Sequence, residues 1–315
     1  MGIKIVSAGS YVPERVLTNE ELERMVDTSD EWIRTRTGIR ERRLSEGETT
    51  SDMAAEAVFK ALPSQEEAEE IELIVVATAT PDAFFPSTAC KVQSKIENKR
   101  AIAFDVSAAC TGFIYALYVA DSIMRSKGTK KAVVVGAERF SEIIDWKDRT
   151  TCILFGDGAG AVYLEASEDE EGILGFDIGA DGSYGELLAV PSVGSNEEYP
   201  YYVKMKGNEV FKVAVRTMVD SALRVLEKTG VKPQDISLLI PHQANLRIIR
   251  AVAQRLGLDE DRVFVNLDRY GNTSAASIPI ALDEALRSGR LKKGELALLV
   301  AFGGGFTWGS CVVKV

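Results

Sequence analysis

An internal repeat is the feature that most constrains the fold of this 315-residue chain. An Arg-Ser pair at 125–126 recurs at 287–288, and a Lys-Lys pair at 130–131 recurs at 292–293. Both recurrences have an offset of 162 residues, and an apolar run follows the lysines in each copy. A repeat of this length predicts two copies of one fold, related by a pseudo-twofold axis.

The repeat also predicts where polar side chains meet. The offset carries Cys110 onto Asn272, so these residues are expected at matching strand-to-helix turns. Farther upstream, the apolar run 72–76 pairs with 237–241, and His242 follows the second copy directly. Because equivalent strand ends of a duplicated fold converge, we expect one shared site.

Hydrophobic patterning along the chain alternates between strands and helices, which predicts an α/β protein with helices packed on layered sheets. Strands are expected at residues 3–7, 73–77, 101–104, 132–136, 159–164, 175–178, 238–241, 263–266, 296–301 and 310–313. Helices are expected at 51–62, 87–96, 111–126, 209–228, 246–256 and 274–287. The division into halves is placed in the acidic stretch that follows residue 166.

Composition excludes several classes of function. The net charge of −10 disfavours nucleic-acid binding, which needs a basic surface. No apolar run is long enough for a bilayer and no targeting segment is apparent, so a cytoplasmic protein without membrane contact is expected. The four cysteines lie far apart without a C-x-x-C pair, which argues against a disulfide framework or a zinc site. A single histidine excludes any mechanism that needs two.

Cys110 is the candidate nucleophile. It follows a buried apolar strand and opens a helix among small residues, where free backbone N–H groups favour a thiolate and could form an oxyanion hole. The alternative is a buried structural cysteine. The other three cysteines, Cys90, Cys152 and Cys311, are interpreted as structural.

His242 and Asn272 are the other candidates for chemistry. His242 ends an apolar strand after Pro241, and it is the only side chain with an ordinary pKa near neutrality. A hydrogen-bonded core histidine is its alternative. Asn272 could equally be a helix-capping or turn residue. Two glycine-rich stretches, 155–160 and 302–306, lead into strands and fit neither nucleotide-binding motif, so we interpret them as backbone presented to a substrate.

These residues together resemble a known family. Cys110, a histidine after proline, an asparagine in Gly-Asn-Thr-Ser and the Gly-Gly-Gly-Phe turn at 303–306 are similar to the thiolase-fold condensing enzymes, most closely the β-ketoacyl-acyl-carrier-protein synthase III family. The resemblance implies an αβαβα layered sandwich of two βαβαβαββ halves. We place these halves at 1–168, with Cys110, and at 169–315, with His242 and Asn272.

The resemblance also implies residue roles. Cys110, His242 and Asn272 would be catalytic, with the N–H groups of Cys110 and Gly304 as the oxyanion hole. The coenzyme A site would comprise Thr28, Trp32, Arg36, Arg149, Asn245 and Arg247. The acyl pocket would comprise Phe85, contributed by the partner of a homodimer, with Phe155, Leu187 and Val203.

The implied reaction condenses an acyl-coenzyme A primer with malonyl-acyl carrier protein, without a metal or cofactor, and initiates fatty acid synthesis. A condensing enzyme of a specialised, polyketide-like pathway and a non-catalytic coenzyme A-binding module are the alternatives. Because the chain is acidic, an anionic carrier protein needs a local basic face. The helix after His242 offers Arg247, Arg250 and Arg255, with Lys212 from the preceding helix.

Overall fold

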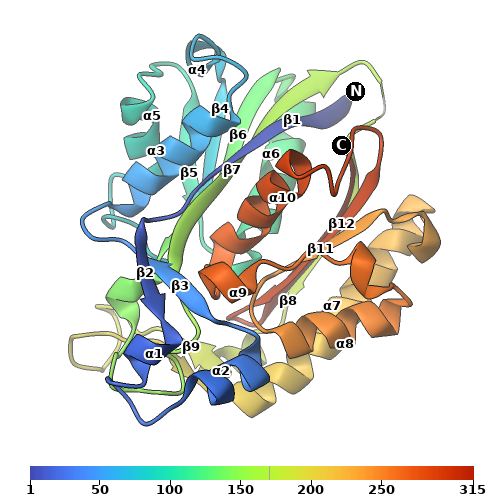
Figure 1. Ribbon diagram of the computed structural model, residues 1–315. Coiled ribbons are helices and arrows are strands. Elements are labelled where there is room, and N and C mark those ends of the chain that lie inside the picture. Colours follow the sequence, from blue (N-terminus) through green and yellow to red (C-terminus); the bar gives the residue numbers. More distant parts are fainter. Residues whose placement is uncertain (170) are drawn as a thin grey trace.

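Two β-sheets form the framework of the protein (Figure 1). The computed structural model describes residues 1–169 and 171–315. The first sheet has the order β1-β7-β6-β4-β5, with bounds Gly2–Tyr11, Asp157–Ser167, Lys131–Arg139, Leu73–Ala77 and Ile102–Val106. The second has the order β11-β12-β13-β8, with bounds Leu238–Pro241, Leu296–Gly303, Thr307–Lys314 and Ile173–Ala180.

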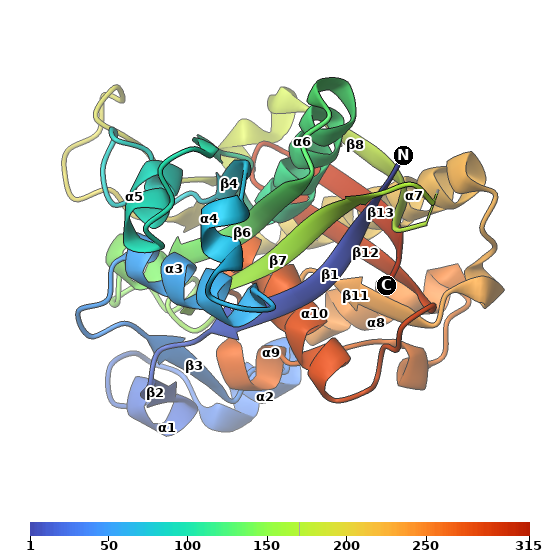
Figure 2. The same cartoon turned by 90° about the horizontal axis from the view of Figure 1, so that it is seen from above.

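Helices fill three layers around these sheets (Figures 1 and 2). The central layer, between the sheets, holds α6 (Gly112–Lys127) and α10 (Ser277–Arg287). The outer face of the first sheet is covered by α3 (Thr50–Ala61) and α5 (Thr88–Lys95). On the far side of the second sheet lie α7 (Gly207–Thr229) and α8 (Leu246–Leu256). The predicted αβαβα sandwich is confirmed.

Burial explains why the inner strands form where they do. Every residue of β4 is buried, which is the pattern of a parallel strand covered on both faces. Glycines let the central helices approach the first sheet closely. A Cβ atom on Gly136 would lie 2.2 Å from the Ala275 carbonyl oxygen, and one on Gly160 would lie 2.6 Å from the Ile280 nitrogen.

The register of the repeat differs from the sequence-based prediction. Four pairs of elements start 165 residues apart, namely β4 and β11, the 3-10 turns Ala109–Thr111 and Ser274–Ala276, α6 and α10, and β6 and β12. Ala109 and Ser274 share a positive φ, of 46° and 49°. Cys110 therefore corresponds to Ala275, and the predicted equivalence with Asn272 is wrong by three residues.

The error arises because the dipeptides that are identical in sequence do not occupy structurally equivalent positions in the two halves. Lys131 begins β6, whereas Lys292 and Lys293 lie in the turn before β12. The helix α10 is five residues shorter than α6, and a longer turn compensates. Exposed charged residues do not specify register, because only the buried alternation is constrained by packing.

A fifth strand in the second sheet, predicted at 263–266, is not formed. This segment makes one isolated bridge, between Val263 and Leu239, where the first sheet has the strand β5. Side chains satisfy its backbone instead, since Gln243 donates to the Phe264 carbonyl and accepts from the Asn266 amide. Its apolar composition reflects the burial of Val263 and Phe264 in the core and not a strand ladder.

A small cap formed by residues 15–44, near the N-terminus of the chain, was not predicted from the sequence. It comprises β2 (Arg15–Thr18), α1 (Asn19–Leu22), α2 (Asp30–Thr37) and β3 (Glu41–Leu44), whose short charged segments carry little periodicity. Four further short elements are α4 (Glu67–Glu70), β9 (Leu188–Ala189), β10 (Lys204–Met205) and α9 (Leu267–Tyr270). The fully buried Arg42 ties this cap to the core by donating to the carbonyls of Leu17 and Ile153. Among the described residues, no helix is long and apolar enough to cross a membrane.

Candidate active site

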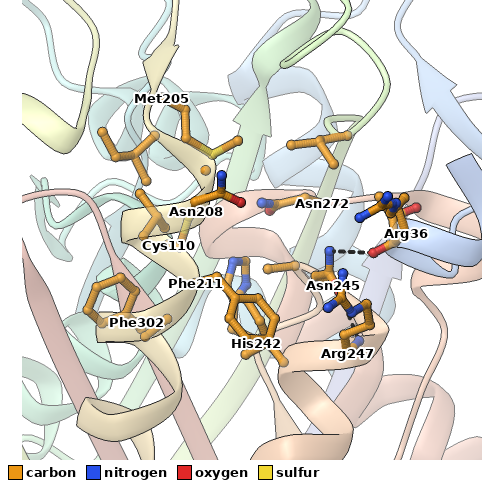
Figure 3. Close-up of a pocket in the computed structure, with 18 of the residues that line it drawn as sticks. Arg36, Cys110, Met205, Asn208, Phe211, His242, Asn245, Arg247, Asn272 and Phe302 are labelled. Carbon is orange, nitrogen blue, oxygen red and sulfur yellow. Dashed lines mark hydrogen bonds between the residues drawn. The ribbon is translucent and has the colours of Figure 1, made fainter. Parts of the chain in front are cut away.

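A cavity of about 500 Å³ lies where elements of both halves meet (Figure 3). Cys110, His242 and Asn272 all line it, so the structure brings the three predicted catalytic residues together. Its walls come from the beginning of α7, the beginning of α8 and the segment 153–155. Trp32, Arg36 and Arg247 line it at the surface end, so one channel joins the exposed face to the buried cysteine.

Cys110 lies in the 3-10 turn that leads into α6, with only 6% of its surface exposed. Gly303, at the end of β12, packs directly on its backbone. A Cβ atom at Gly303 would lie 2.9 Å from the Cys110 nitrogen, so only a glycine lets the two backbones approach this closely. A backbone amide beside the thiol is suited to stabilise an oxyanion.

The electrostatics of Cys110 differ from the sequence-based expectation. Burial raises the pKa of its thiol to about 12, and the charge of Glu138 acts in the same direction. The Ser274 hydroxyl and the amide of Cys110 itself oppose this effect. Burial therefore favours the protonated thiol at neutral pH.

His242 directly follows β11 and is held by hydrogen bonds on its backbone and ring. Its amide donates to the Val300 carbonyl at 2.8 Å, and its Nδ1 lies 2.7 Å from the Ser277 hydroxyl. Burial lowers the pKa of the imidazole to about 3, so the ring is neutral at physiological pH.

Asn272 is fixed at both its backbone and its side chain. Its amide donates to the Leu154 carbonyl at 2.8 Å, and its carbonyl accepts from Gly156 at 3.0 Å. Its side-chain Oδ1 accepts from the Ser274 amide at 2.8 Å, so the Nδ2 group is the end that remains to donate. The asparagine therefore presents an N–H donor to the same cavity as His242 (Figure 3).

Aromatic and cationic groups form the mouth of the cavity. The guanidinium groups of Arg36 and Arg149 lie 5.9 and 5.5 Å from the centre of the Trp32 ring. Asn245 caps α8 and donates to the Arg36 carbonyl at 3.1 Å, drawn as a dashed line in Figure 3. Arg247 lies over the Phe211 ring at 5.4 Å. A planar, anionic ligand fits this combination of stacking surface and positive charge.

Other predicted site residues lie outside this cavity lining. Phe85 is 85% exposed, while Val203 is buried beside the lining residue Met205. Leu187 packs against the core, and its neighbour Leu188 faces the cavity instead. Of the predicted acyl-pocket residues, only Phe155 lines the cavity.

The remaining predictions near the site concern Gly304 and Thr28. A Cβ atom on Gly304 would lie 3.0 Å from the Leu188 carbonyl oxygen, so the wall packs tightly there. The Thr28 hydroxyl is buried and has no hydrogen-bond partner in the described part of the chain. Neither residue belongs to the cavity lining.

The predicted basic face is exposed on α7 and α8. Lys212, Arg247, Arg250 and Arg255 all present their side chains to solvent. Lys212 and Arg247 also line the cavity, which places positive charge at its mouth. Arg250 pairs with Glu260 at 3.1 Å, so part of its charge is neutralised locally.

Several residues at the site were missed by sequence reasoning. Glu138 is fully buried, accepts from the Thr80 hydroxyl at 2.7 Å and the Ala79 amide at 3.0 Å, and its pKa is raised by burial to about 7. The buried Ser274 hydroxyl lies close enough to lower the pKa of both Glu138 and Cys110. Glu138 lies near the end of β6 and Ser274 opens the 3-10 turn before α10, and neither position by itself signals a role. Across the described residues, no cluster of three or more His, Cys, Asp or Glu is arranged to hold a metal ion.

Comparisons with known proteins agree on one family. The 3-oxoacyl-[acyl-carrier-protein (ACP)] synthase III model matches residues 104–182, and the model of its C-terminal part matches 226–315. A β-ketoacyl-[acyl-carrier-protein] synthase III from Aquifex aeolicus is 54% identical over 315 residues, covering 100% of both chains.

Solved structures show the same likeness. The crystal structure of 3-oxoacyl-[acyl-carrier-protein] synthase III from Aquifex aeolicus matches with a TM-score of 0.95 and 53% identity over 100% of both chains. The priming β-ketosynthase of the R1128 polyketide pathway matches with a TM-score of 0.92 and 36% identity, covering 99% of this chain and 96% of that one. The chain therefore belongs to the β-ketoacyl-acyl-carrier-protein synthase III family, the acyltransferase-type condensing enzymes that initiate fatty acid synthesis.

Proposed function

We propose that this chain condenses an acyl-coenzyme A primer, such as acetyl-coenzyme A, with malonyl-acyl carrier protein, releasing CO₂ and forming a 3-oxoacyl-acyl carrier protein. The observation that carries the proposal is the single cavity lined by Cys110, His242 and Asn272. The fatty-acid pathway is favoured over a specialised one because the relatives above 50% identity carry the synthase III name, whereas the polyketide enzyme is 36% identical.

The first half-reaction transfers the acyl group to Cys110. The sulfur attacks the thioester carbonyl carbon, and its proton passes to the departing coenzyme A sulfur. The oxyanion of the tetrahedral intermediate is stabilised by the N–H groups of Cys110 and Gly304. Gly303 supports this role because only a glycine lets the end of β12 come this close to the Cys110 amide.

The second half-reaction uses the two donors in the other half of the molecule. The malonyl thioester loses CO₂, and the electron pair forms an enolate at the thioester oxygen. A neutral His242 and the Nδ2 group of Asn272 donate hydrogen bonds to that oxygen. The enolate carbon then attacks the acyl carbon on Cys110, and the cysteine sulfur departs.

Binding of coenzyme A is assigned to the mouth of the cavity. Trp32 with Arg149 would hold the adenine ring, and Thr28 and Arg36 lie at the same end. Asn245 and Arg247 would contact the pantetheine arm and the phosphates. No cofactor is needed, because the thioester is itself the substrate.

We further propose a cytoplasmic homodimer with two functional halves per chain. Residues 1–168 supply the nucleophile, and residues 169–315 supply His242 and Asn272. Phe84 and Phe85 are 81% and 85% exposed, which is unusual for neighbouring aromatic side chains unless another surface covers them. Phe85 would then enter the partner's acyl pocket with Phe155, Leu187 and Val203. Light scattering at assay concentration tests the dimer.

Intact mass spectrometry tests the catalytic proposal. Incubation with acetyl-coenzyme A, followed by digestion, should place one acetyl group on Cys110. The Cys110→Ser and Cys90→Ala variants provide the comparison, and only the first should lose the acylated species. Acylation of another cysteine would contradict the assignment. Absence of any acylation, with coenzyme A still bound, would favour the non-catalytic binding module.

A further inference from the structure

The hydroxyl group of Ser277 lies against the buried side of the His242 ring. Its Oγ is 2.7 Å from Nδ1, and the Gln243 amide donates to the same oxygen at 3.3 Å. All three residues are at least 96% buried. Ser277 begins the central helix α10, so the position of its hydroxyl is set by the sandwich and not by a mobile loop.

Counting protons at this oxygen distinguishes the two neutral forms of His242. If Nδ1 carried the proton, both Nδ1 and the Gln243 amide would donate to Ser277, and the hydroxyl proton would have no acceptor among the described residues. If Nε2 carries it, the hydroxyl donates to Nδ1, and the Nε2–H is the one group of these three residues left without a partner among the described residues. Buried polar groups without partners are costly, so the second arrangement is favoured.

The duplicated fold shows independently that the serine is paired with the histidine. At the observed offset of 165 residues, His242 corresponds to Ala77 and Ser277 corresponds to Gly112. A Cβ atom on Gly112 would lie 3.1 Å from the Ala77 methyl group, so the two positions also touch in the first half. The first half has neither a histidine nor a hydroxyl group at these two positions. The serine therefore occurs only in the half whose histidine it contacts.

We propose that Ser277 is a positioning residue that holds His242 in the Nε2–H form, with Nδ1 as an acceptor. The proton is then on the nitrogen for which no described residue provides a partner, and a donor is available to the cavity. This inference rests on the proposed function for its catalytic meaning, but the protonated nitrogen can be measured without any substrate.

The single histidine makes the test unusually direct. Nitrogen NMR of protein labelled with ¹⁵N in the histidine ring reports His242 alone, and the two-bond couplings to the ring protons identify the protonated nitrogen. Wild-type enzyme at neutral pH should show Nε2–H. An Nδ1–H form, or a charged ring, would overturn the proposal even if no variant folds.

Variants separate positioning from general stability. Ser277→Ala should give a mixture of the two neutral forms and slow malonyl-coenzyme A decarboxylation about tenfold, the value of one neutral hydrogen bond. Acetylation of Cys110 should stay within about twofold. Ser277→Thr keeps the hydroxyl and should restore Nε2–H, and Ser288→Ala, at the exposed end of the same helix, should change nothing. Unaltered spectra and decarboxylation in Ser277→Ala would overturn the proposal. Loss of acetylation in the wild type would instead contradict the proposed function.

Discussion

The α-carbon of Gly303 faces the backbone of Cys110 so closely that a methyl group there would lie 2.9 Å from the Cys110 nitrogen. The position that corresponds to Gly303 in the first half is Glu138, whose carboxylate approaches the amide of Ala275, the counterpart of Cys110, at 3.5 Å. One half thus places a carboxylate beside this amide, whereas the other places a glycine there. The amide of Cys110 therefore has no side chain from this position that competes with a substrate oxygen.

The first prediction is that Gly303→Ala slows acylation of Cys110 by about 100-fold or more, the effect of losing one oxyanion donor. The added methyl group would also contact Thr111, so the turn must shift. Intact mass measured over time after mixing with acetyl-coenzyme A gives the rate. Gly194→Ala is the matched control, because nothing lies within 4 Å of its added methyl group. An unchanged rate in Gly303→Ala would contradict the role of the Cys110 amide as an oxyanion donor.

The second prediction is that acylation and decarboxylation can be separated by mutation. Cys110→Ala should abolish condensation yet still decarboxylate malonyl-acyl carrier protein, because the enolate donors remain. His242→Ala and Asn272→Ala should lose decarboxylation by about 100-fold while they retain acylation. Release of labelled CO₂ and the mass of the acyl-enzyme measure the two steps. Normal decarboxylation by His242→Ala would show that the roles are misassigned.

The third prediction concerns pH. Because burial lowers the pKa of His242 to about 3, its ring stays neutral throughout the physiological range. Decarboxylation of malonyl-coenzyme A by Cys110→Ala should therefore show no acid limb near the ordinary histidine pKa of about 6.5. A rate that halves near that pH, while the protein stays folded, would mean that His242 titrates normally.

The fourth prediction concerns stability. Burial raises the pKa of Glu138 from 4.5 to about 7, so the folded state holds a proton that the unfolded state has released between these values. The resulting stabilisation is fully present below about pH 4.5 and is lost as pH rises through about 7, by about 3 kcal/mol. Urea unfolding at several pH values should show a flatter profile for Glu138→Gln than for wild type. The exposed Glu142→Gln should keep the wild-type slope.

The fifth prediction is that the face formed by Lys212, Arg247, Arg250 and Arg255 binds the acidic carrier protein. Combined Arg247→Glu and Arg250→Glu should raise the apparent KM for malonyl-acyl carrier protein and weaken its salt dependence. Lys293→Glu is the control, because Lys293 precedes β12 and so lies at the end of that strand opposite Gly303. Unchanged carrier kinetics at low salt would place docking elsewhere.

Much of the framework was predictable because short stretches of the sequence show which apolar residues will be buried. The apolar runs 73–77 and 238–241 became β4 and β11 with the predicted bounds, and 246–256 became α8. These segments carry their own periodicity and end at turn-forming residues. The three residues proposed for catalysis were also identifiable, since each lies where an apolar strand or a glycine turn ends.

Tertiary structure alone decided the register of the repeat and the environment of each reactive group. Most residues of the dipeptides that suggested an offset of 162 are exposed, so packing does not hold them to equivalent places. His242 contacts Ser277, and the pKa of Cys110 responds to Ser274 and Glu138. These residues are distant in sequence and come together only when the central helices dock between the sheets. A pKa or a preferred proton position depends on burial and on which polar atoms come within 3 Å, and the order of residues along a chain determines neither until the chain has folded.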